Sequence, residues 1–137
     1  MGRVLSVDYG RKRVGLAVTD PLKIIANALD AVHPDRAVDY IEKYMQREDV
    51  DTIVVGLSKN LDNSDTELMQ FVRPFVKKLE KFNLPIVWVD ERFTSKMAAH
   101  AMVAAGIKKS DRRKKENTDK VSAVIILQSY LDSIVNK

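Results

Sequence analysis

Residues 4–18 read VLSVDYGRKRVGLAV, and this stretch decides the fold. Apolar residues alternate with other residues on both sides of Gly10–Arg13, which predicts two antiparallel strands joined by a tight basic loop. A weaker strand pattern follows at residues 24–32 and closes before a proline. The N-terminal part of the chain is therefore expected to form a three-stranded antiparallel meander.

Asp8 is the first candidate site residue. With Gly10–Arg13 as the loop, Asp8 lies opposite Gly15 and Ser6 lies opposite Ala17, so almost no side chain faces the carboxylate. A charged group on a strand suited to burial costs free energy unless a cation, a hydrogen-bond donor or solvent meets it. Turn initiation by Asp8 is the alternative interpretation.

The composition is that of a globular protein. The chain has 137 residues, of which 45% are hydrophobic and 31% charged, and it fits one domain spanning residues 1–137. It has no cysteine and only two histidines, His33 and His100, which argues against thiolate and zinc sites. No leader pattern and no apolar run of about 18 residues is visible, so we expect no membrane contact and a cytoplasmic location.

Downstream of the meander, helical patterns alternate with short apolar strands. Helices are expected at 35–49 with Asp35 as the N-cap, at 64–79 behind a Ser64-x-x-Glu67 capping box, at 95–105 and at 118–135, and strands at 52–57 and 86–89. This order predicts an α/β domain with a central five-stranded mixed sheet, three antiparallel strands then parallel crossovers, flanked by helices. It is the order of a ribonuclease H-like domain.

Positive charge is concentrated in two short runs. The formal net charge is +4, yet one segment of eight residues holds Lys108, Lys109, Arg112, Arg113, Lys114 and Lys115, and the hairpin loop holds Arg11, Lys12 and Arg13. Such runs often bind polyanions, with a solvated loop as the alternative for either run alone. We expect both runs to contact nucleic-acid phosphates.

Acidic residues fall at the ends of three expected elements: Asp8 after the first strand, Asp90 and Glu91 after the fifth, and Asp119 in the first turn of the last helix. Carboxylates on different elements can converge and hold two Mg²⁺ or Mn²⁺ ions for phosphodiester hydrolysis. Asp90 and Glu91 alternate across the strand, so at most one of them faces Asp8. The spacing alone leaves that choice open, and Asp119 could instead simply favour the helix dipole.

Four motifs in order along the chain are similar to those of the YqgF family, also called RuvX, in the Holliday-junction-resolvase-like branch of the ribonuclease H superfamily. They are VDYGRKRVGLA at 7–17, VGL at 55–57, DERFTS at 90–95 and DKVSAVIILQSYL at 119–131. The resemblance covers essentially the whole chain. It departs from the family pattern at Ser58, where a proline is common, and at Asn63, where a glycine is common, so the loop there is expected to differ in shape.

The resemblance implies a metal-dependent nuclease that processes the 5′ end of pre-16S ribosomal RNA. Carried over by position, Asp8, Glu91 and Asp119 become the catalytic, metal-binding acids. Arg92 either clamps a phosphate or pairs with a neighbouring carboxylate. The expected partner is structured RNA, with branched DNA as the alternative substrate.

Three other functions stay open at this level. Cleavage of a four-way DNA junction would use the same chemistry and would need a two-fold dimer, and the sequence does not distinguish a monomer from a homodimer. A ribosome-assembly factor could keep the fold and bind RNA without turnover. A nucleotide-binding domain of the actin-like kind would need a second domain to enclose its ligand.

Overall fold

The computed structural model describes residues 2–62, 64–91 and 115–135, with side chains for all of these except 115–119 and 135. The predicted 95–105 helix, His100, Arg92 and the basic residues 108–114 lie outside the described residues. Lys115 is described only as the first residue of a helix backbone.

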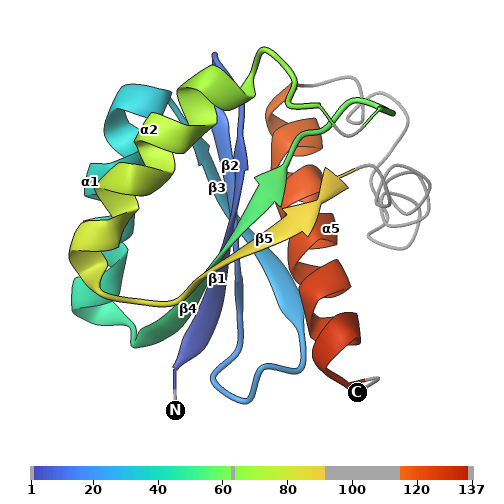
Figure 1. The fold of residues 1–137 in the computed structure, drawn as a ribbon. Helices are drawn as coiled ribbons and strands as arrows, with labels where there is room; N and C mark the ends of the chain where they lie inside the picture. The colour runs from blue at the N-terminus through green and yellow to red at the C-terminus, as the bar shows by residue number, and fades with distance from the viewer. Residues whose placement is uncertain (1, 63, 92–114, 136–137) are drawn as a thin grey trace.

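The described strands form one five-stranded mixed sheet in the order β3-β2-β1-β4-β5 (Figure 1). β1, β2 and β3 pair antiparallel, whereas β1 pairs parallel with β4 and β4 parallel with β5. The predicted sheet is thus confirmed. The strands span Arg3–Tyr9, Val14–Thr19, Ala26–Val32, Val50–Leu57 and Ile86–Asp90.

The β1–β2 hairpin has the predicted register. Asp8 lies opposite Gly15, and Ser6 lies opposite Ala17. The loop between the strands is residues 10–13, as expected. A side chain at Gly10 would come within 2.6 Å of the Arg13 carbonyl oxygen, so the tightness of this turn requires glycine.

The β2–β3 connection is fixed by one carboxylate. Asp20 accepts backbone hydrogen bonds from Leu22, Ile24 and Ile25 at 3.1, 2.9 and 2.7 Å. This loop takes up the first two residues of the predicted strand, so β3 begins at Ala26 instead of at residue 24. The loop leaves the side chains of these three residues largely exposed at the end of the sheet away from the β1–β2 loop.

The Asp20 loop should make stability depend on acid pH. Hydrogen bonds from the Ile25, Ile24 and Leu22 amides outweigh burial and lower the pKa of Asp20 below its ordinary 3.8. A lowered folded-state pKa contributes stability above 3.8 that is lost as the pH falls through the lower value. We expect Asp20→Ala to flatten the fall in unfolding free energy between about pH 5 and about pH 3. Urea unfolding of both proteins at each pH measures this, and parallel curves would contradict it.

The sheet is covered on both faces. Helices α1, Pro34–Arg47, and α2, Met69–Leu79, pack on one face, and α5, Lys115–Val135, packs on the other (Figure 1). A 3-10 turn, η1, follows α2 at Glu80–Phe82. The larger apolar core lies under α1 and α2, and the smaller one lies between α5 and the sheet.

The first two helices begin differently from the prediction. His33, and not Asp35, caps α1, because its Nδ1 accepts the Asp35 amide while Asp35 lies in the first turn. The predicted capping box is also wrong, since α2 starts at Met69 without any side-chain cap. Ser64 instead bonds within the preceding loop, where its amide and hydroxyl both donate to Asp62.

The last helix begins three residues before the predicted Thr118. Asp119 is therefore the fifth residue of α5 and not in its first turn. Because the effect of the helix dipole falls off within the first turn, that explanation of Asp119 is weakened. α5 is buried on the sheet side through Ala123, Ile126 and Leu127, as its apolar pattern predicts.

Among the described helices, none is both long enough and apolar enough to cross a lipid bilayer.

Candidate active site

Asp8 lies near the C-terminal end of β1, on the face of the sheet that α5 covers. Side chains alternate along a strand, so Val4, Ser6 and Asp8 share one face. Val4 belongs to the core beneath α5, and Ser6 is fully buried there. Asp8 itself is only half-buried. The strand thus passes from a sealed core to a solvent-accessible position within four residues.

One buried hydrogen bond fixes α5 against β1. The Ser6 hydroxyl donates to the Ala123 carbonyl oxygen at 2.7 Å. This bond crosses 117 positions of sequence and sets the height of the helix along the strand. Sequence reasoning used Ser6 only for the strand register and missed this role.

Ser6→Ala should destabilise the fold by about 1 kcal/mol, the usual net value of an intramolecular hydrogen bond. Ser133→Ala is the matched control, because the Ser133 hydroxyl also donates to a carbonyl of α5, that of Tyr130 at 2.6 Å, but on the exposed surface. Denaturant unfolding compares the two. Equal losses of stability would show that the Ser6 bond has no special role.

Glu91 follows β5 and lies against Gly56 of β4. A Cβ atom built on Gly56 would collide with the Glu91 Oε1 atom and would come within 2.8 Å of Ile126 Cδ1 in α5. Gly56 therefore leaves the space that the Glu91 carboxylate occupies. A glycine inside a buried, β-branched strand is a recognised sign of such close approach, although the sequence analysis did not use it.

The structure separates Asp90 from Glu91. Val87 and Val89 pack into the core beneath α5, whereas Trp88 packs on the opposite core. By alternation Asp90 continues the Trp88 side, and the contact of Glu91 with Gly56 and α5 places it on the Asp8 side of the sheet. The structure thus brings Glu91, and not Asp90, to the same face as Asp8.

The position of Asp119 follows from the backbone of α5. This helix runs opposite in direction to β1 and β4 (Figure 1). From the Ser6–Ala123 hydrogen bond, Asp119 lies four residues back along the helix, about 6 Å, and Asp8 lies two residues on along the strand, about 7 Å. Both displacements lead toward the same end of the sheet. The side chain of Asp119 is outside the described part of the chain.

Carboxylates at this end of the sheet suit a hard divalent cation, which prefers oxygen ligands. The half-buried Asp8 and Glu91 supply such oxygens on one face, and Gly56 places no side chain between the sheet and Glu91. Among the side chains that the structure describes, no three histidine, aspartate or glutamate groups converge. The third predicted ligand, Asp119, is not among those side chains.

The hairpin loop carries its basic residues to this same end of the sheet. The Arg11 guanidinium lies 4.6 Å from the centroid of the Phe71 ring in α2, a cation–π contact. Arg11 and Lys12 are exposed, and Arg13 is half-buried. Of the predicted phosphate contacts, these three are the ones whose side chains the structure describes.

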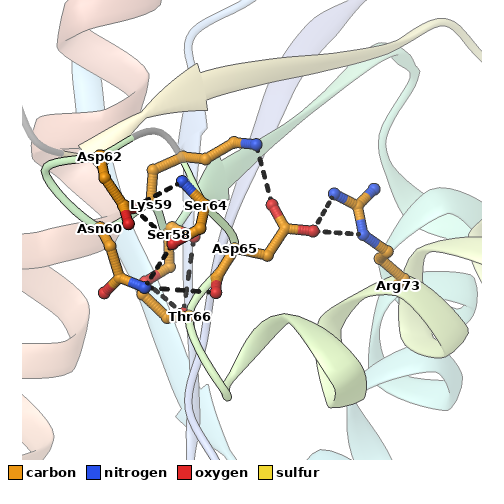
Figure 2. A network of polar contacts seen from close by, with 8 residues as sticks. All are labelled: Ser58, Lys59, Asn60, Asp62, Ser64, Asp65, Thr66 and Arg73. Carbon is orange, nitrogen blue, oxygen red and sulfur yellow. Dashed lines mark hydrogen bonds and ion pairs between the residues drawn. The ribbon is translucent and has the colours of Figure 1, made fainter.

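The loop between β4 and α2 is ordered by its own side chains (Figure 2). Lys59 and Asp65 form an isolated antiparallel bridge and an ion pair of 2.8 Å. Arg73 binds the other oxygen of Asp65 at 2.7 Å. The hydroxyl of Thr66 donates to Ser58 Oγ at 2.9 Å, so Ser58, where the family commonly has proline, takes part in holding this loop.

Known proteins resemble this chain over nearly its whole length. The model of the RuvX family, described as Holliday junction resolvase, matches residues 2–133. The chain belongs to the RuvX family. A relative from Porphyromonas gingivalis, named "Putative pre-16S rRNA nuclease", is 51% identical over 97% of this chain and 98% of its own length. A relative of the same name from Phocaeicola vulgatus is 49% identical over 97% of both chains.

The fold of this RuvX-family chain is ribonuclease H-like, as predicted. The structure of Thermus thermophilus RuvC in complex with a Holliday junction substrate aligns with a TM-score of 0.65 and 13% identity, covering 100% of this chain and 98% of that one. A second T. thermophilus RuvC structure aligns with a TM-score of 0.60. At such low identity the likeness concerns the fold alone.

Proposed function

We propose that this protein is a metal-dependent endonuclease that hydrolyses phosphodiester bonds in structured RNA, at the 5′ end of pre-16S ribosomal RNA. Membership of the RuvX family and the names of its relatives support a nuclease. We propose that the protein is located in the cytoplasm. Its proposed oligomeric state is a monomer or a homodimer.

The observation that carries the proposal is the pair of carboxylates at one end of the sheet. Asp8 lies in β1 and Glu91 directly follows β5, the strands on either side of β4, and both acids share the α5 face. Two carboxylates there would repel a phosphodiester unless cations lie between them. Their placement is therefore one that makes sense for a cation-assisted reaction on a phosphate.

Asp8, Glu91 and Asp119 are the residues that would hold Mg²⁺ or Mn²⁺. When bound, such ions polarise a phosphoryl oxygen and stabilise the charge on the attacking and leaving oxygens. The backbone of α5 supports a contribution from Asp119, because it lies on the same side of the Ser6–Ala123 bond as Asp8.

Basic residues would hold the RNA backbone. In the hairpin loop, the Phe71 ring orients the Arg11 guanidinium, which leaves less rotamer freedom to lose on binding phosphate. Arg11, Lys12 and Arg13 form one side of the proposed phosphate contact. Further phosphate contacts are proposed for Arg92 and for the basic residues of segment 108–115: Lys108, Lys109, Arg112, Arg113, Lys114 and Lys115.

The test uses purified protein, Mg²⁺ or Mn²⁺, and three end-labelled substrates: pre-16S leader RNA, single-stranded RNA and a four-way DNA junction. We expect cleavage of the leader RNA that stops when a chelator is added. Selective cleavage of the junction would mean that the protein resolves junctions and does not process RNA. Junction resolution is the activity named in the description of the family model. Binding of RNA with no cleavage of any substrate would indicate an assembly factor.

A further inference from the structure

A single leucine protrudes at the end of the sheet that carries the two acids. Leu61 is 95% exposed, the highest value among the large apolar side chains that the structure describes. It lies in the loop that leaves the C-terminal end of β4, the strand between β1, which carries Asp8, and β5, which Glu91 directly follows. One exposed leucine is ordinary on a protein surface, so its position and its support decide whether it matters.

The support of Leu61 is a hydrogen-bonded turn. The Asn60 amide donates to the Ser64 carbonyl oxygen at 2.8 Å, and the Asn60 side chain donates to the Ser64 hydroxyl at 3.0 Å. One residue further from the tip on each side, Lys59 and Asp65 close the loop with a backbone bridge and with the ion pair drawn in Figure 2. Polar groups thus hold the turn while the leucine gains nothing from burial. The backbone of a turn held in this way loses little further freedom on binding, so Leu61 is presented from a fixed position.

The charges of this loop do not suit a phosphate. Lys59 is paired with Asp65, which also binds Arg73, so Asp65 lies between the two cations (Figure 2). Next to Leu61, Asp62 is an exposed carboxylate that would repel the RNA backbone. The part of the loop tip that RNA could contact favourably is therefore the apolar side chain of Leu61.

We infer that Leu61 contacts the face of an unpaired base close to the cleaved phosphate and so makes the protein prefer RNA with an unstacked nucleotide at that place. The inference rests on the proposed function, because it needs RNA to approach this end of the sheet. Leucine has no hydrogen-bonding group, so it distinguishes an exposed base face from a stacked one without reading sequence.

The test compares two RNA hairpins of equal length and charge, one fully paired and one with a single unpaired nucleotide. Dissociation constants are measured in chelator, so that binding does not depend on cleavage. We expect the wild-type protein to prefer the hairpin with the unpaired nucleotide and Leu61→Ser to reduce that preference several-fold, because an apolar side chain placed against an unstacked base is lost. Leu61→Phe should retain the preference.

Leu22→Ser is the matched control, since Leu22 is 62% exposed on another hydrogen-bonded loop at the opposite end of the sheet. It should leave the preference unchanged. The inference is overturned if the wild-type protein binds both hairpins equally, if Leu61→Ser keeps the full preference, or if Leu22→Ser loses as much. Failure of the nuclease proposal would look different: the preference would persist while no RNA was cleaved with metal present.

Discussion

Asp8→Asn is expected to lower the rate of RNA cleavage by at least about 10²-fold while leaving RNA binding intact, because removing one carboxylate ligand removes several kcal/mol of cation-assisted charge stabilisation. Asparagine keeps the size of the side chain and removes its charge. The folded state should survive the change, since Asp8 is half-buried outside the two apolar cores. Single-turnover cleavage and a filter-binding measurement on the same RNA separate the two effects.

Glu91→Gln and Asp90→Asn supply the sharpest comparison for this result. The two residues are neighbours in sequence, but Glu91 lies against Gly56 on the Asp8 side and Asp90 continues the opposite side of β5. Glu91→Gln should therefore behave like Asp8→Asn, whereas Asp90→Asn should cleave at close to the wild-type rate. Full activity of Asp8→Asn, or equal losses in the two neighbouring variants, would contradict the proposed site.

A measurement without substrate tests the same carboxylates. A cation that binds only the folded protein raises the free energy of unfolding. The size of the increase depends on the ratio of the free cation concentration to its dissociation constant. We expect Mn²⁺ to raise the melting temperature of the wild-type protein and to have a smaller effect on Asp8→Asn and Glu91→Gln. An equal rise in all three proteins would mean that the ions bind elsewhere.

The sequence was sufficient for the sheet and for the strand register of Asp8. Alternation over residues 4–18, with the loop at residues 10–13, predicted the register that places Asp8 opposite Gly15, because the length of a hairpin loop fixes which residues pair. It could not choose between Asp90 and Glu91, since the choice depends on where β5 ends and on the space above a neighbouring strand. Strand alternation carries no record of such contacts, although Gly56 within β4 is a sign that another group approaches the strand closely.

Local polar competition explains why the capping box failed. Ser64 and Glu67 have the right spacing, but Asn60 and Asp62 engage Ser64 first, and α2 starts later. Such side-chain bonds to nearby groups are the usual rivals of a helix cap. The resemblance to the family had marked the same loop as different at Ser58 and Asn63. Ser58 is one of the residues that hold the loop, and Asn63 is outside the described residues.

Gly56→Ala is expected to destabilise the protein by about 1–3 kcal/mol, the usual cost of overpacking a core, and to lower cleavage as well. The added Cβ atom would lie too close to both the Glu91 Oε1 atom and the Ile126 Cδ1 atom. Glu91 must then swing away from the sheet or the strand must shift. Either movement displaces one of the two acids that the proposed reaction needs, so stability and activity should fall together.

A double-mutant cycle separates the two contacts of this added methyl group. If the collision with the carboxylate dominates, Glu91→Ala should recover much of the stability lost in Gly56→Ala, giving a coupling energy of about 0.5–3 kcal/mol between these contacting residues. If pressure on Ile126 dominates, the two losses should simply add. Denaturant unfolding of the four proteins measures the coupling. Additive losses would mean that Gly56 serves the packing of α5, and that the close approach of Glu91 to the strand is incidental to the need for glycine.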